Sequence, residues 1–122
     1  MNVSWDEDSS IFRFSTDRIE GIVAARFQGT DSHCHRLYQV VHKPTGKLVS
    51  PDNEREAGLL SLYKILARSS YLTELRVQRP QVQPLESGLC FRWQPTMHHQ
   101  AYVESTVEIK EPNIIDVSLK VE

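Results

Sequence analysis

The sequence predicts a mainly β fold, an antiparallel sheet or sandwich of about seven strands with one amphipathic helix near residues 52–68. Two observations carry this prediction. Apolar and polar residues alternate over most of the chain, which is typical of half-buried strands. The regular succession of strand and helix that a doubly wound parallel fold requires is missing. A helix packed on a curved antiparallel sheet, an α+β arrangement, is the alternative.

Length and charge limit the classes of function. The 122 residues suffice for one domain, which we place at residues 11–122, either complete or as the front part of a larger sandwich. The acidic residues 1–10 are expected to form a mobile tail. A net charge of −2 does not fit a nucleic-acid partner. No apolar run reaches the ~18 residues of a membrane span and no signal peptide is recognisable, so we expect no membrane partner and a cytoplasmic location.

Two strands are expected near the N-terminus. Phe12 and Phe14 lie on one side of the segment IFRF, which is typical of a half-buried strand. In residues 19–27 every second residue is Ile, Gly, Val, Ala or Phe, which predicts the next strand. A helix that begins after Asp17 is the competing interpretation, and Gly21 weakens it.

The segment RLYQVVHKPTGKLVSP predicts a hairpin. Its strands are residues 36–42 and 47–49. Pro44 suits the second position of a type I turn, and Gly46 can take the positive φ that closes the loop. Strict alternation places the apolar residues of the first strand on two buried faces, with Tyr38 and Val40 on one and Leu37 and Val41 on the other.

Residues 52–68 carry the helical pattern. Ser50 can cap this helix, and Pro51 suits its first turn, where its missing N–H costs no hydrogen bond. Gly58 weakens it by up to ~1 kcal/mol relative to Ala. The apolar residues recur at helical spacing, at Leu59, Leu62, Tyr63 and Leu66.

The C-terminal half returns to strand patterns. Four segments alternate, and the last two form a second hairpin around the polar turn KEPN. Proline and glycine mark a loop between the first two segments. The strands are expected at residues 75–77, 89–93, 103–109 and 115–121, and the loop residues are Pro80, Pro84 and Gly88.

No motif for catalysis, a metal or a cofactor is present. His33, Cys34 and His35 form an HCH triplet, but the other histidines lack the spacing of a structural zinc site, so we expect no metal. Cys34 and Cys90 are expected to be reduced thiols. Because a P-loop, a nucleophile elbow and a dinucleotide-binding motif are all missing, we expect no cofactor and assign no catalytic residue.

The segment FRWQPTMHHQAY has the composition of a sugar-binding surface. An aromatic ring stacks on the apolar side of a pyranose, and Arg, His and Tyr exchange hydrogen bonds with its hydroxyls. The candidate ligand-binding residues are therefore Arg92, Trp93, His98, His99 and Tyr102. The alternative is that the aromatic residues of this strand simply belong to the core.

Four segments also resemble one family. LYQVVHKPTGKLVSP, GLLSLYKILAR, LCFRWQP and VEIKEPNIIDVSLKVE resemble strands of the galactose-mutarotase-like (aldose epimerase-like) carbohydrate-processing β-sandwiches. The resemblance implies antiparallel strands whose concave face binds sugars, and it implies that GLLSLYKILAR is extended. The motif around the catalytic histidine of such epimerases is missing, so the resemblance assigns no catalytic role to His98 or His99.

Two functions are therefore expected. The first is a carbohydrate-binding β-rich domain without catalysis in this chain. The alternative is a protein-interaction or assembly module of α+β type that pairs through a sheet edge, which would also allow oligomers. We do not expect enzyme activity, although an activity of unknown type stays open.

Overall fold

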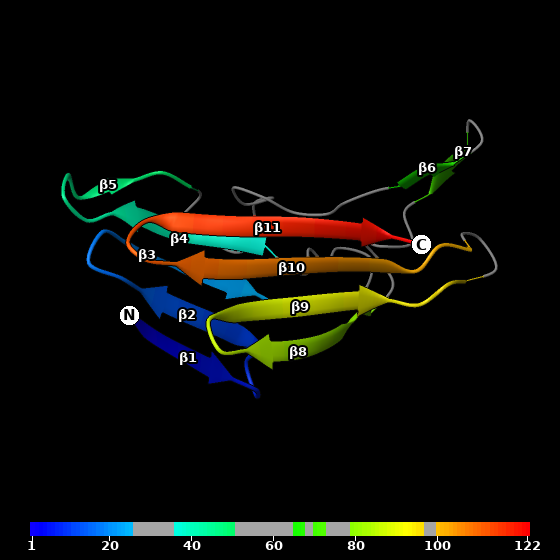
Figure 1. Cartoon of the computed structure of the whole chain (residues 1–122), viewed down its shortest axis with the longest axis horizontal. Coiled ribbons are helices and arrows are strands. Elements are labelled where there is room, and N and C mark those ends of the chain that lie inside the picture. The colour runs from blue at the N-terminus through cyan, green and yellow to red at the C-terminus, as the bar shows by residue number, and fades with distance from the viewer. Residues whose placement is uncertain (26–35, 51–64, 68–69, 73–78, 97–99) are drawn as a thin grey trace.

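The computed structural model describes residues 1–25, 36–50, 65–67, 70–72, 79–96 and 100–122. These residues form eleven strands and no helix, so the prediction of a mainly β fold is confirmed and the expected number of strands was too low. Nine strands form a five-stranded and a four-stranded antiparallel sheet (Figure 1). The two sheets pack face to face as a sandwich.

The five-stranded sheet is a meander in which every strand pairs with the next along the chain. Residues 1–10, expected as a tail, contain its first strand, which pairs with the second from Asn2↔Ser15 to Asp6↔Ile11. The strands are β1 (Asn2–Asp6), β2 (Ile11–Ser15), β3 (Ile19–Ala24), β4 (Arg36–His42) and β5 (Lys47–Leu48).

The four-stranded sheet has the order β11-β10-β9-β8. Pro84 and Gly88, both expected in a loop, lie inside β8 and at the start of β9, which corrects that assignment. The strand tolerates a proline because β8 is an edge strand, where a missing N–H on the outer side breaks no ladder. The strands are β8 (Gln81–Leu85), β9 (Gly88–Trp93), β10 (Val103–Lys110) and β11 (Ile114–Val121).

The predicted helix is not confirmed. Most of residues 52–68 lie outside the described residues. The three that are described, Ile65–Ala67, form strand β6, which pairs with β7 (Ser70–Leu72). Leu66 pairs with Tyr71 across β6 and β7, so it belongs to a strand, although the spacing of the leucines is that of a helix. The strand expected at residues 75–77 also lies outside the described ranges.

The core lies between the two large sheets. Alternate residues of β2 and β3 meet alternate residues of β9 and β10, as the period of two predicts, and β4 contributes Leu37 and Val40. The buried side chains are Phe12, Phe14, Ile19, Val23, Ala25, Leu37 and Val40 from one half, and Leu89, Phe91, Trp93, Val103, Val107 and Ile109 from the other.

A β-bulge in β4 changes which residues face this core. Gln39 has a φ of 52°, and the β3–β4 register shifts between Glu20 and Ile22. Leu37 and Val40 therefore both face the core, whereas Tyr38 packs on the opposite face. The expected pairing of Tyr38 with Val40 on one face was wrong, because strict alternation does not allow for an extra residue.

The predicted hairpin turn after β4 is confirmed. Gly46 has a φ of 67°, and its N–H donates to the carbonyl of Lys43 at 3.2 Å. Ser50, expected to cap a helix, accepts a hydrogen bond at its Oγ from the backbone N–H of Val40 at 2.8 Å. The hydroxyl thereby pairs with a backbone donor next to the bulge.

Two turns meet at one end of the sandwich. The hydroxyl of Thr16, in the β2–β3 turn, accepts from the backbone N–H of Ile19 at 3.0 Å. The same hydroxyl donates to the carbonyl of Pro112, in the β10–β11 turn, at 2.5 Å. The N-terminal ammonium of Met1 forms an ion pair with Glu111 at 2.6 Å. These contacts connect the two sheets outside the apolar core.

Candidate functional site

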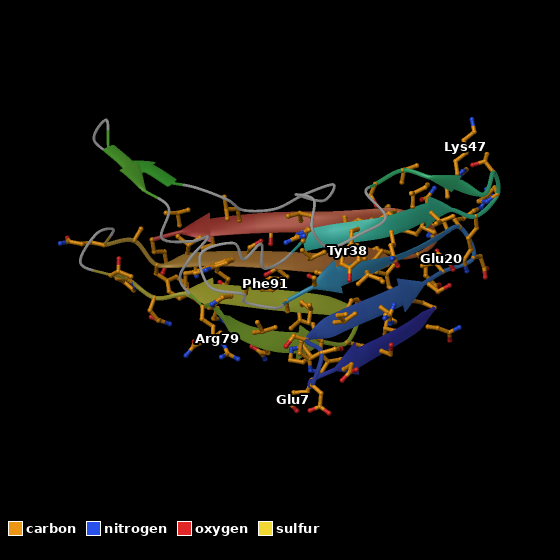
Figure 2. The ribbon with its side chains drawn as sticks, turned by 180° about the vertical axis from the view of Figure 1, so that it is seen from behind. Glu7, Glu20, Tyr38, Lys47, Arg79 and Phe91 are labelled. Atoms are coloured by element: carbon orange, nitrogen blue, oxygen red, sulfur yellow. The ribbon has the colours of Figure 1, made fainter. Side chains whose placement is uncertain are left out.

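The structure separates the aromatic and the basic residue of the predicted sugar site. Trp93 is 0% exposed, and its ring stacks on Phe91 with centroids 6.1 Å apart inside the core. Arg92 lies between Phe91 and Trp93 in β9, so its side chain points to the outer face of the sheet, where it is half-buried. Figure 2 shows Phe91 between the two sheets. Trp93 therefore cannot stack on a bound sugar in this structure.

Of the remaining predicted site residues, Tyr102 is described, and it interacts electrostatically with Arg92. Tyr102 is half-buried just before β10, and its backbone N–H and carbonyl bond to Glu122. His98 and His99 lie outside the described residues. Of the five candidates, the structure thus places three: Arg92 and Tyr102 lie near each other, whereas Trp93 is buried in the core.

Arg92 instead belongs to a polar row on the outer face of the four-stranded sheet. Its Nη1 donates to Gln83 at 2.6 Å and its Nε donates to Glu104 at 3.2 Å. The Cys90 thiol donates to the same carboxylate oxygen at 3.1 Å, and the Thr106 hydroxyl donates to Cys90 Sγ at 3.7 Å. We call these residues, Gln83, Cys90, Arg92, Glu104 and Thr106, the polar row.

The contacts in the polar row stabilise the ionised form of Glu104 and the protonated form of Cys90. The hydrogen bond from Cys90, with the nearby Arg92 guanidinium, lowers the pKa of Glu104. Burial, with the bond to Glu104, raises the pKa of the Cys90 thiol. Cys90 therefore stays protonated at neutral pH and is a poor nucleophile. The row is suited to holding β8, β9 and β10 together rather than to chemistry.

The lowered pKa of Glu104 predicts a pH dependence of stability. Glu104 is ionised in the folded state at lower pH than in the unfolded chain, so its contribution is present above the unfolded pKa and is lost as pH falls through the folded pKa. Glu104→Gln should therefore destabilise the protein more at pH 7 than at pH 3 in urea unfolding. Glu7→Gln, in the exposed β1–β2 turn, is the control for loss of one carboxylate. An equal Glu104→Gln effect at both pH values would contradict this prediction.

The free edge of β11 is the most unusual surface of the described residues. Val117, Leu119 and Val121 are 40%, 57% and 57% exposed, although they share a face with the buried core residues of β10. No described strand pairs with the outer side of β11. Leu48 and Val49 are also exposed, and Figure 1 shows β5 and β11 on the same side of the sandwich.

The other edges of the two large sheets are less suited to pairing. β8 contains Pro84, and β5 has two residues. β1 has five residues and ends with Asp6. β11 has eight residues, no proline and an apolar alternate face. Natural proteins usually protect such an edge, because its unpaired N–H and C=O groups can bind another strand.

A groove lies on the outer face of the five-stranded sheet. It has a volume of about 400 Å³ and crosses β1 to β4 beside the Gln39 bulge. Arg13 and Glu20 bring opposite charges to it. The polar residues that line it are Asn2, Ser4, Arg13, Ser15, Glu20 and Gln39.

The sequence did not point to the groove or to the open edge. Alternation predicted the strand at 115–121, but strand order decides whether a strand lies at an edge. The groove depends on a bulge, for which Gln39 gives no signal.

Among the described residues no three His, Cys, Asp or Glu side chains could hold a metal together, and the HCH triplet lies outside them. In the same part of the chain no helix could cross a membrane.

Comparisons of the chain with protein-family models, with curated proteins and with solved structures gave no match. The resemblance to galactose-mutarotase-like proteins therefore stays a prediction.

Proposed function

We propose that this protein is a protein-interaction module that binds an extended segment of a partner along the free edge of β11. The observation that carries the proposal is an eight-residue edge strand with three exposed apolar side chains on one face. In such strand addition, backbone hydrogen bonds supply affinity and alternate side chains supply specificity.

The energetics of this edge favour binding. Burying the exposed part of each of the three apolar side chains contributes roughly 1 kcal/mol. Each new backbone hydrogen bond contributes about 1 kcal/mol. The sum has to exceed the cost of association, so we expect moderate affinity for a short segment.

The test uses a display library of extended peptides at about 1 µM protein, a concentration that retains binders of moderate affinity and lies below the range expected for self-association. Tyr102 and Glu122 exchange both backbone hydrogen bonds, so the even-numbered residues of β11 bond to β10 and the odd-numbered ones face outward. Leu119→Pro therefore removes an outward N–H of β11, whereas Ser118→Pro removes an N–H that bonds to β10 and should unfold the edge. We expect peptides that bind the wild type, lose affinity for Leu119→Pro and shift the amide NMR signals of β11. If every selected peptide shifts signals elsewhere, the proposal is wrong.

Carbohydrate binding is a second candidate, and the groove on the five-stranded sheet favours it. Its Arg, Glu, Asn and Ser side chains can exchange hydrogen bonds with sugar hydroxyls. In NMR titrations with mono- and oligosaccharides up to ~10 mM, signals of β2 and β3 around Arg13 and Glu20 should shift. Arg13→Gln should abolish the shifts, and Arg79→Gln, outside the groove, should not. Absence of shifts in the groove for the whole panel would exclude this candidate.

A further inference from the structure

We infer that the partner of the β11 edge is a second copy of this chain. The two β11 strands pair antiparallel with Ser118 opposite Ser118, and the two four-stranded sheets become one continuous sheet. This inference rests on the proposed function, because it names the segment that the edge binds.

The hydrogen bonds of β10 and β11 determine which backbone groups face outward. Tyr102 and Glu122 exchange both backbone hydrogen bonds, at 2.8 and 2.9 Å. In an antiparallel ladder such pairs alternate, so the even-numbered residues of β11 bond to β10. The odd-numbered residues direct their N–H and C=O groups to the free edge. They are Ile115, Val117, Leu119 and Val121, whose side chains also form the apolar face.

A second β11 must therefore bond through its own odd-numbered residues. With Ser118 opposite Ser118, Val117 bonds to Leu119 of the second copy, and Ile115 bonds to Val121. Each bonded pair is apolar, and each copy supplies the same surface, as a two-fold interface requires.

The charged residues select this register. With Ser118 at the two-fold axis, Asp116 of each copy lies opposite Lys120 of the other. These two form a non-hydrogen-bonded pair, in which the Cα atoms approach to about 4.5 Å and the side chains meet most closely.

The neighbouring registers lack this match. Centring the pair on Leu119 places Asp116 opposite Glu122, and centring it on Val117 places Asp116 opposite Ser118. Centring on Asp116 or on Lys120 places that residue opposite its own like charge. Like charges directly opposite each other are destabilising. Of these five registers, the one centred on Ser118 alone joins opposite charges.

The charges affect register more than affinity. Asp116 already pairs with Lys110 at 2.6 Å, and Lys120 pairs with Glu122 at 3.0 Å, all on exposed side chains. Exposed ion pairs contribute little free energy. An interface of one strand from each copy is also small, so we expect a dimer with a Kd of about 10 µM to 1 mM.

Sedimentation velocity between ~10 µM and ~1 mM tests the association. The wild type should change from monomer to dimer over this range, and Leu119→Pro should weaken the dimer by about tenfold or more. Asp116→Lys should weaken it, whereas Asp116→Lys with Lys120→Asp should restore it. Glu86→Lys, in the β8–β9 turn, is the charge control and should behave as the wild type. Far-UV circular dichroism verifies that every variant is folded.

Disulfide trapping tests the register in a Cys34→Ser background. Ser118→Cys should form a covalent dimer under mild oxidation, because the two residues face each other at the short cross-strand distance. Asp116→Cys and Lys120→Cys should each crosslink slowly alone and quickly when mixed.

A wild type that stays monomeric at 1 mM, with no crosslinking by Ser118→Cys, would overturn the inference. Peptides that still bind β11 would then leave the proposed function intact. If crosslinking is fastest for Asp116→Cys alone, the proposed register is wrong.

Discussion

Replacing Gly88 with alanine is expected to lower the free energy of unfolding by about 3 kcal/mol or more. Gly88 begins β9 and lies opposite Glu108 of β10. A Cβ at this position would lie 1.9 Å from the backbone oxygen of Val107 and 2.9 Å from the Cα of Glu108. Because both atoms belong to the backbone, no side-chain rotation relieves the overlap, and β9 and β10 would have to separate.

Gly46→Ala is the matched control. Its Cβ would have nothing within 4 Å, so only the positive φ of 67° is unfavourable, at a cost of about 1 kcal/mol. Urea unfolding followed by circular dichroism measures both variants. A Gly88→Ala protein as stable as Gly46→Ala would show that the strands approach less closely than the structure has them.

Replacing Trp93 with alanine is expected to cost about 3–5 kcal/mol. Trp93 is the largest of the fully buried side chains and packs between the two sheets. Its removal leaves a cavity that the surrounding strands, held by ladder hydrogen bonds, fill only in part. Such a loss is a large share of the stability of a small domain, which is about 5–15 kcal/mol.

Trp5→Ala is the comparison on the edge strand β1. Trp5 is half-buried and packs on the border of the same core, so its removal should cost about 1–2 kcal/mol. The chain has two tryptophans, so each variant also isolates the fluorescence of the other. Emission of Trp93 alone should be blue-shifted and resistant to acrylamide quenching. Similar stability losses for both variants would contradict the packing described for Trp93.

Strands with clean alternation were predictable from the sequence. Residues 36–42 and 103–109 were expected within a residue of their observed bounds. A strand with one buried face shows a period of two in its sequence, and a strand buried on both faces shows a continuous apolar run. The Gln39 bulge was not predictable, since it depends on pairing with β3. The strand around Pro84 was missed because proline is compatible with strands at an edge, and edge position is a property of the assembled sheet.

The candidate site was less predictable than the fold. The mixture of aromatic and polar residues around Trp93 suggested a ligand surface, but neighbouring residues in a strand point to opposite faces. Arg92 and Trp93 therefore divide between the outer face and the core. The edge of β11 has the same composition as a core strand, and only the sheet order distinguishes the two.

Pro84 has a consequence for the size of any assembly that forms through β11. Once two β11 strands have paired, the joined sheet ends on both sides in a β8 strand. Pro84 removes a backbone donor from the middle of that strand, which discourages addition of further strands there. Growth of this sheet should therefore stop at a closed pair instead of continuing into a fibre.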